Sequence, residues 1–189
     1  MLVAILNLGF FIIEVIASQI IGSVSLLADS VDFFEDAGVN FLIFLSFAWS
    51  LKARNRLARF FAFFLLVPAT LTVITAIGKG TNPEAPEPLV LSLISICALA
   101  VNVYCAFALA GHRKTEGPLI QAAWLAARND SIANFAILAG ALVSLVLDTG
   151  WIDIAIGVGI FILNADAAVV ILRHSRLESQ QIKGQNPDQ

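Results

Sequence analysis

Apolar residues in this chain gather in six long runs, and a short polar or basic break separates each run from the next. The runs lie near residues 2–21, 25–49, 59–78, 88–110, 119–146 and 151–172. A helix needs about 20 apolar residues to cross the hydrocarbon core of a bilayer. The pattern therefore predicts an all-α membrane protein with six transmembrane helices. We expect residues 1–175 to form one transmembrane domain and residues 176–189 to form a short polar cytoplasmic tail.

The composition agrees with this interpretation. Of the 189 residues, 59% are hydrophobic and only 13% are charged, whereas a typical soluble domain is about 25% charged. The net charge of −3 leaves no strongly basic surface of the kind that binds nucleic acid, so we expect no nucleic-acid partner. This composition therefore predicts a protein embedded in the lipid bilayer.

Lysine and arginine residues indicate which side of the membrane is cytoplasmic. They are concentrated in the breaks SLKARNRLAR and GHRKTEGP and in the tail, and six crossings place all three segments on one side. The opposite side holds only Lys79, set among several acids. Because cytoplasmic loops carry an excess of lysine and arginine, both termini are predicted to be cytoplasmic. We expect an integral, multi-pass protein of the bacterial inner (plasma) membrane.

Four acids interrupt the second run, which reads LLADSVDFFEDAGVNFLIF. On a helix, Asp29, Asp32, Asp36 and Asn40 fall within one stripe about 80° wide, and Glu35 lies about 60° outside it. Asp29 is nearest the outer end, where we expect an interfacial or capping residue. Asp32 and Asp36 are deeper and one turn apart, and the pair would cost about 5–7 kcal/mol if both ionised in hydrocarbon. Because the two carboxylates also repel each other, they require other helices, water, protons or a cation around them.

A divalent metal ion meets these demands, provided that a second helix supplies further ligands. The fifth run carries Asp130 and Asn134, again four residues apart. Asp36 and Asp130 are each about 16 residues, or about 24 Å, from a cytoplasmic lysine, Lys52 and Lys114 respectively. The two polar pairs are therefore level in the membrane, which predicts a shared site. A helix–helix contact is an equally good interpretation of the amide of Asn134.

These strings resemble the cation diffusion facilitator (cation efflux) family of metal/proton antiporters. GSVSLLADSVDFFEDAGVN looks like the second helix of that family, and WLAARNDSIANFAILAGALVS looks like its fifth helix. In both helices of the family, a His or Asp precedes an Asp by four positions. The resemblance covers all six runs and implies that Asp32, Asp36 and Asp130 bind the metal ion. The chain is similar to a compact subgroup that lacks a C-terminal cytoplasmic metal-binding domain.

One ligand position of the family is altered in this chain. The residue four positions before Asp130 is Ala126, which has no donor atom. The fourth ligand is then Asn134, Asn129, water or another acid such as Asp29. We prefer Asn134 because it lies only about 40° from Asp130 around the helix, whereas Asn129 lies about 100° away.

The resemblance implies a divalent-metal transporter that is not an enzyme and carries no prosthetic group. It implies export from the cytoplasm in exchange for protons, and it implies a homodimer. Zn²⁺ is the first candidate ion, with Co²⁺, Fe²⁺, Mn²⁺ and Cd²⁺ as further candidates. A site without histidine is harder, so it would accept Mn²⁺, Fe²⁺ and Co²⁺ more readily relative to Zn²⁺ than a histidine site does.

Two other functions are compatible with intramembrane acids. In a non-transporting membrane scaffold, the acids would only pack against neighbouring helices. An intramembrane metal-dependent phosphotransferase of the CDP-alcohol type also places Asp-x-x-x-Asp on helices, but it expects a glycine where this chain has Ala28. A metal-binding measurement separates the scaffold from the other two. The sequence assigns no role to Glu14, Glu35 or His112.

Overall fold

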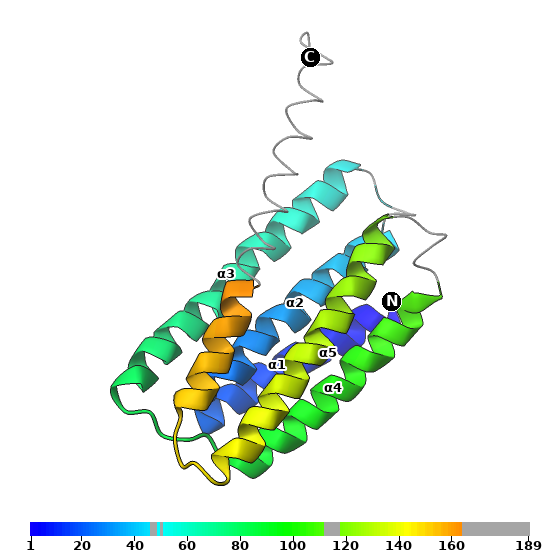
Figure 1. The fold of residues 1–189 in the computed structure, drawn as a ribbon. Coiled ribbons are helices and arrows are strands. Elements are labelled where there is room, and N and C mark those ends of the chain that lie inside the picture. Colours follow the sequence, from blue (N-terminus) through cyan, green and yellow to red (C-terminus); the bar gives the residue numbers. More distant parts are fainter. Residues whose placement is uncertain (46–48, 50, 112–117, 164–189) are drawn as a thin grey trace.

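The computed structural model describes residues 1–45, 49, 51–111 and 118–163. Five helices are bounded within these ranges: α1 (Leu2–Ile21), α2 (Val24–Leu45), α3 (Leu51–Thr81), α4 (Pro88–Ala110) and α5 (Pro118–Ser144). A sixth helix follows, of which Trp151–Leu163 is described. Successive helices run in opposite directions within one bundle (Figure 1), and the described ranges contain no strand. The predicted all-α, six-helix bundle is confirmed. The boundary predicted at residue 175 lies outside the described residues.

Helix α3 begins earlier than the sequence pattern predicts. The basic segment SLKARNRLAR was expected to be a break, yet the chain is helical from Leu51 onward. The segment contains no glycine or proline, and leucine, lysine, arginine and alanine all favour helix. Polarity alone therefore does not end a helix here. The 31 residues of α3 give a length of about 46 Å, so α3 exceeds the roughly 30 Å thickness of the hydrocarbon core.

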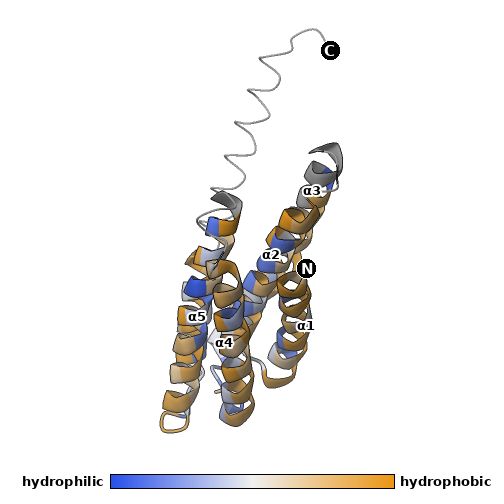
Figure 2. Ribbon diagram, turned by 90° about the vertical axis from the view of Figure 1, so that its right-hand side faces the viewer, coloured by the Kyte–Doolittle hydropathy of each residue, from blue (hydrophilic) through white to orange (hydrophobic). Residues whose placement is uncertain are grey.

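The outer surface of the bundle is apolar. Among the described residues, α1 and α4 are long and apolar enough on their own to span a membrane. Large side chains such as Ile20 and Phe107, which are 78% and 77% exposed, point away from the bundle. Figure 2 shows hydrophobic residues along most of the ribbons and hydrophilic residues interrupting α2 and α5. Such a surface fits contact with lipid, as expected for an integral membrane protein.

Helix α2 is the central element of the bundle. Every side chain from residue 24 to residue 34 is buried, and α2 contacts α1, α3 and α5. Leu26 and Ala28 belong to an apolar core cluster that also contains Ile137 of α5 and Ile160 of the sixth helix. Any acid on the inward side of α2 is therefore surrounded by protein.

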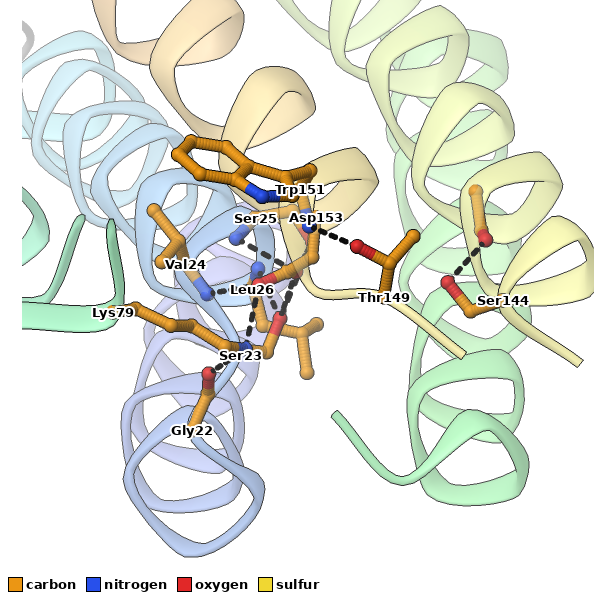
Figure 3. A network of polar contacts seen from close by, with 11 residues as sticks. Gly22, Ser23, Val24, Ser25, Leu26, Lys79, Ser144, Thr149, Trp151 and Asp153 are labelled. Atoms are coloured by element: carbon orange, nitrogen blue, oxygen red, sulfur yellow. Dashed lines mark hydrogen bonds and ion pairs between the residues drawn. The ribbon is translucent and has the colours of Figure 1, made fainter. Parts of the chain in front are cut away.

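A network of polar contacts joins the start of α2 to the start of the sixth helix (Figure 3). The carboxylate of Asp153 accepts hydrogen bonds from the backbone N–H groups of Val24 and Ser25, at 2.8 and 3.2 Å. It also accepts from the hydroxyls of Ser23 and Ser25, at 2.7 and 2.6 Å, and from Lys79 Nζ of α3 at 3.1 Å. The first N–H groups of a helix have no partner within the helix, and a negative charge there is favourable. We call these five residues the Asp153 junction.

Two glycines allow the close packing around this junction. Gly22 has φ of 64°, which ends α1 in the left-handed conformation, and its carbonyl accepts a hydrogen bond from Lys79 Nζ. Gly157 lies where the sixth helix passes α2, and a Cβ atom there would be 2.7 Å from the carbonyl carbon of Val24. The two backbones therefore approach each other in a way that only glycine allows, as small residues commonly do between membrane helices.

Candidate metal site

The polar face predicted for α2 points into the bundle. Asp32, Asp36 and Asn40 are 7%, 4% and 6% exposed, and Asp29 is fully buried. Glu35, which the helix geometry places outside this stripe, is half-buried. Asn40 Nδ2 donates to the carbonyl of Asp36, at 2.8 Å, which orients its amide along the helix. The predicted stripe is confirmed as an inward face.

The expectation that Asp29 is interfacial or a cap is wrong. Asp29 is fully buried, and its Oδ1 accepts a hydrogen bond from Asn134 Nδ2 of α5 at 3.1 Å. The physical reason is that Asp153 already caps α2, and the tight turn at Gly22 together with the sixth helix covers this end of it. Asp29 therefore lies inside the bundle.

The polar faces of α2 and α5 meet, as their matched depths predict. Asn134 is fully buried and also donates to the carbonyl of Asp130, at 3.1 Å. Asp130 is partly exposed, and its carboxylate is close enough to those of Asp32 and Asp36 to interact with them electrostatically. Asp32, Asp36, Asp130 and Asn134 therefore belong to one polar region between two helices. That they bind a metal ion stays a prediction.

The acids of this region are not drawn together into a closed site. Within the described part of the chain, no three histidine, cysteine, aspartate or glutamate side chains converge closely enough to hold a metal ion. Binding an ion among Asp32, Asp36 and Asp130 would therefore require side chains or helices to move toward it.

The other asparagine of the fifth helix is on the surface of the bundle. Asn129 is exposed and accepts a hydrogen bond from Arg128 Nη2 at 3.3 Å. The guanidinium of Arg128 also lies 5.5 Å from the ring centroid of Trp124. Asn134 is buried and Asn129 is exposed, and the preference for Asn134 as a ligand stays a prediction.

Glu14 of α1 is a buried acid to which the sequence assigned no role. It is fully buried, it contacts Asp29, and both of its carboxylate oxygens lack a hydrogen-bond donor. The signal in the sequence was a lone glutamate in the middle of an apolar run. Glu35 gains no role from its half-buried position, and His112 lies outside the described residues.

Comparison with known proteins adds an independent observation. Residues 57–178, which are about two thirds of the chain, match the family model of the cation efflux transmembrane domain. The matched range contains Asp130 and Asn134, whereas Asp32 and Asp36 precede it. A search of curated proteins found no match. The bundle has an apolar exterior and inward acids on α2, and most of the chain matches the family model. The chain therefore belongs to the cation diffusion facilitator (cation efflux) family of transmembrane cation transporters.

Proposed function

We propose that this cation transporter exports a divalent metal ion from the cytoplasm in exchange for protons, with Zn²⁺ as the first candidate ion. The proposed ligands are Asp32, Asp36, Asp130 and Asn134. The observation that carries the proposal is the meeting of the polar faces of α2 and α5, through the bond from Asn134 to Asp29, inside an otherwise apolar bundle.

The chemistry of the side chains explains how the two fluxes are linked. Carboxylates must be deprotonated to bind a metal ion, so metal binding releases protons. The same carboxylates that hold the ion therefore carry protons when the ion is absent. Each ionised acid in the bilayer interior would otherwise cost roughly 2.5–3.5 kcal/mol, which disfavours a state that holds neither metal nor protons.

The open arrangement of the acids fits a transporter that changes shape. A ligand shifts a conformational equilibrium only if it binds one state better than the other. Asp130 lies on α5, whereas Asp32 and Asp36 lie on α2. An ion bound by all three carboxylates therefore favours a state in which α2 and α5 are closer together. Alternating access follows if the metal-bound and proton-bound states open to different sides.

Flux measurements on purified protein in sealed vesicles test this proposal. A metal-sensitive dye and a pH-sensitive dye would report Zn²⁺ and proton movement in the same vesicles. We expect Asp36→Asn and Asp130→Asn to lower both fluxes at least about tenfold, since each change removes a charge worth several kcal/mol to a bound dication. Asp148→Asn, which changes an exposed acid in the connection before the sixth helix, should leave both fluxes unchanged.

Three outcomes would contradict parts of the proposal. Undiminished metal-driven proton movement in Asp36→Asn or Asp130→Asn would eliminate these residues as the transport site. Metal movement without proton movement would eliminate antiport. A purified protein that binds no divalent metal would favour the scaffold instead. A crystal structure of metal-soaked protein, with anomalous scattering, would identify the ion and its fourth ligand.

Orientation and oligomeric state are proposed on the same basis. The lysine and arginine pattern supports cytoplasmic termini, and reporter fusions that place residues 82–87 in the cytoplasm would contradict this orientation. The family resemblance supports a homodimer, which chemical cross-linking in native membranes would detect.

A further inference from the structure

Three polar side chains from three different helices meet at a fully buried point on the junction side of Asp32. They are Glu14 of α1, Asp29 of α2 and Asn134 of α5, and each has no exposed surface. Asn134 Nδ2 donates to Asp29 Oδ1 at 3.1 Å, and the carboxyl groups of Glu14 and Asp29 lie within hydrogen-bonding reach of each other. We call these three residues the Glu14 cluster.

The Glu14 cluster has more acceptors than donors. Both carboxylate oxygens of Glu14, Asp29 Oδ2 and Asn134 Oδ1 lack a donor. Two carboxylates in contact cannot hydrogen-bond unless they share a proton, since each offers only acceptor atoms. Leaving a buried polar atom unpaired costs about 1–3 kcal/mol, and more for a charged group. The cluster therefore needs a shared proton or a positively charged partner.

The protein supplies no such partner among the described residues. The ion pair found there joins Lys79 to Asp153, at the junction, and neither Glu14 nor Asp29 has a basic neighbour within hydrogen-bonding distance. A small cation can fill the role because the four unpaired oxygens come from three helices. A bidentate glutamate, an aspartate oxygen and an amide oxygen are together a donor set suited to a hard divalent ion.

Charge balance argues for an ion in addition to the one that the transporter carries. The carboxylate of Glu14 interacts electrostatically with those of Asp29, Asp32 and Asp130, and Asp130 in turn interacts with Asp36. These five acids share one region between the helices, so a single divalent ion offsets fewer than half of their charges when all are ionised. A second divalent ion removes most of the remainder.

We propose that Glu14 and Asp29, with the amide oxygen of Asn134, form a second divalent-cation site that is separate from the transport site. Asp29 precedes Asp32 by three residues, so the second site is displaced by about 4.5 Å along α2, toward the Asp153 junction. Its donors are all oxygen atoms, which suits Mn²⁺ or Mg²⁺ better than softer ions. Asn134 belongs to both proposed sites, and its one amide oxygen can serve only one ion at a time.

The test counts bound Mn²⁺ on the purified full-length chain, by the loss of the electron paramagnetic resonance signal of free Mn²⁺. We expect two ions per chain in the unaltered protein and one in Glu14→Gln, which keeps the size of the side chain. Asp36→Asn should also bind one ion, and the double variant should bind none. Glu35→Gln changes a half-buried acid outside the inward stripe, and it should still bind two.

The expected count of two rests on the proposed function, because one of the two ions occupies the transport site, but the outcomes separate the two proposals. An unchanged count in Glu14→Gln would overturn the second site and assign protons to the Glu14 cluster. A single ion in the unaltered protein would do the same if Asp36→Asn removes it and Glu14→Gln does not. Such a result would leave the transport site intact if Asp36→Asn still lowers the count and the flux. Conversely, a count of two in Asp36→Asn would remove that residue from the transport site without affecting the second site.

A folding check accompanies each count. The thiol of Cys105 is fully buried, so slow labelling of it reports a packed bundle. If Glu14→Gln exposes this thiol, Asp29→Asn takes its place in the same measurement, with the same expected count of one.

Discussion

Replacing Asp153 with alanine should be one of the most destabilising single changes in this protein. The side chain of Asp153 is 1% exposed and that of Lys79, its ionic partner, is 11% exposed. The alanine variant leaves the Lys79 ammonium in a largely buried position with only the carbonyl of Gly22 to accept from it. It also removes the acceptor for the first backbone N–H groups of α2.

The magnitude follows from the character of these contacts. Removing one partner of a buried ion pair costs about 3–5 kcal/mol, because the other charge is left uncompensated. For Lys79→Met the expected loss is smaller, about 1.5–3 kcal/mol. The change removes the bonds from Lys79 to Asp153 and to the Gly22 carbonyl, but Asp153 keeps its contacts with Ser23, Val24 and Ser25. At about 2–4 °C per kcal/mol for a chain of this size, Asp153→Ala should lower the melting temperature by roughly 6–20 °C.

Labelling of a buried thiol during heating provides the assay. Cys105 is buried and Cys97 is exposed, so a Cys97→Ser background leaves one thiol that reacts with a fluorogenic maleimide only on unfolding. The melting temperature would be compared among Asp153→Ala, Lys79→Met and a control, Asp148→Ala, in the same detergent.

The ranking of the variants is the decisive result. We expect the largest loss for Asp153→Ala, an intermediate loss for Lys79→Met and none for Asp148→Ala, whose side chain is exposed. A loss below about 3 °C for Asp153→Ala, or equal losses in all three variants, would refute the argument that the junction holds α2, α3 and the sixth helix together.

Three further predictions concern packing and ligand choice. Gly157→Ala should destabilise the bundle by about 1–3 kcal/mol because its Cβ would meet backbone atoms of α2. Gly159→Ala is the control, since a Cβ there has nothing within 4 Å. Thermal unfolding compares the two variants, and equal melting temperatures would contradict the close helix contact. Asn134→Ala should weaken metal binding by about 10–100-fold and Asn129→Ala should not, as titration calorimetry would show; the reverse order would make Asn129 the ligand. Ala126→His should raise the affinity for Zn²⁺ relative to Mn²⁺ by about tenfold, or about 1.4 kcal/mol, because it adds an imidazole ligand. An unchanged ratio of the two affinities would place residue 126 outside the site.

The sequence predicted the helices well because membrane spans are governed by one strong signal, the length of an apolar run. The bounds of α1, Leu2–Ile21, and α4, Pro88–Ala110, agree with the predicted runs. The prediction was wrong for the start of α3, where charge was taken as a sign of a loop. Lysine and arginine mark the membrane boundary, but they do not stop a helix, so the boundary of a span and the end of a helix differ there.

The candidate site was predicted in part, for an identifiable reason. Helical periodicity correctly selected the inward face of α2, because an angle around one helix is a local property. It could not place Glu14 against Asp29, nor Asn134 against Asp29, since those contacts depend on how three helices pack. The position of Asp29 was predicted wrongly because the sequence gives its distance from the outer end of α2. It does not show that the sixth helix packs over that end.

The tight turn at Gly22 and Ser23 also bears on how the chain enters the bilayer during synthesis. Helix α1 is apolar enough to insert alone, whereas the acids of α2 cost about 2.5–3.5 kcal/mol each at mid-membrane and its apolar residues return only about 0.3–0.6 kcal/mol each. Because so short a turn leaves the two helices adjacent from the start, we expect them to insert as a hairpin, with Glu14 and Asp29 already facing each other. Asp153 is synthesised more than a hundred residues later. The cap of α2 is therefore completed only when the sixth helix has been synthesised. The stability of the hairpin formed by α1 and α2 thus depends on a helix that is made much later.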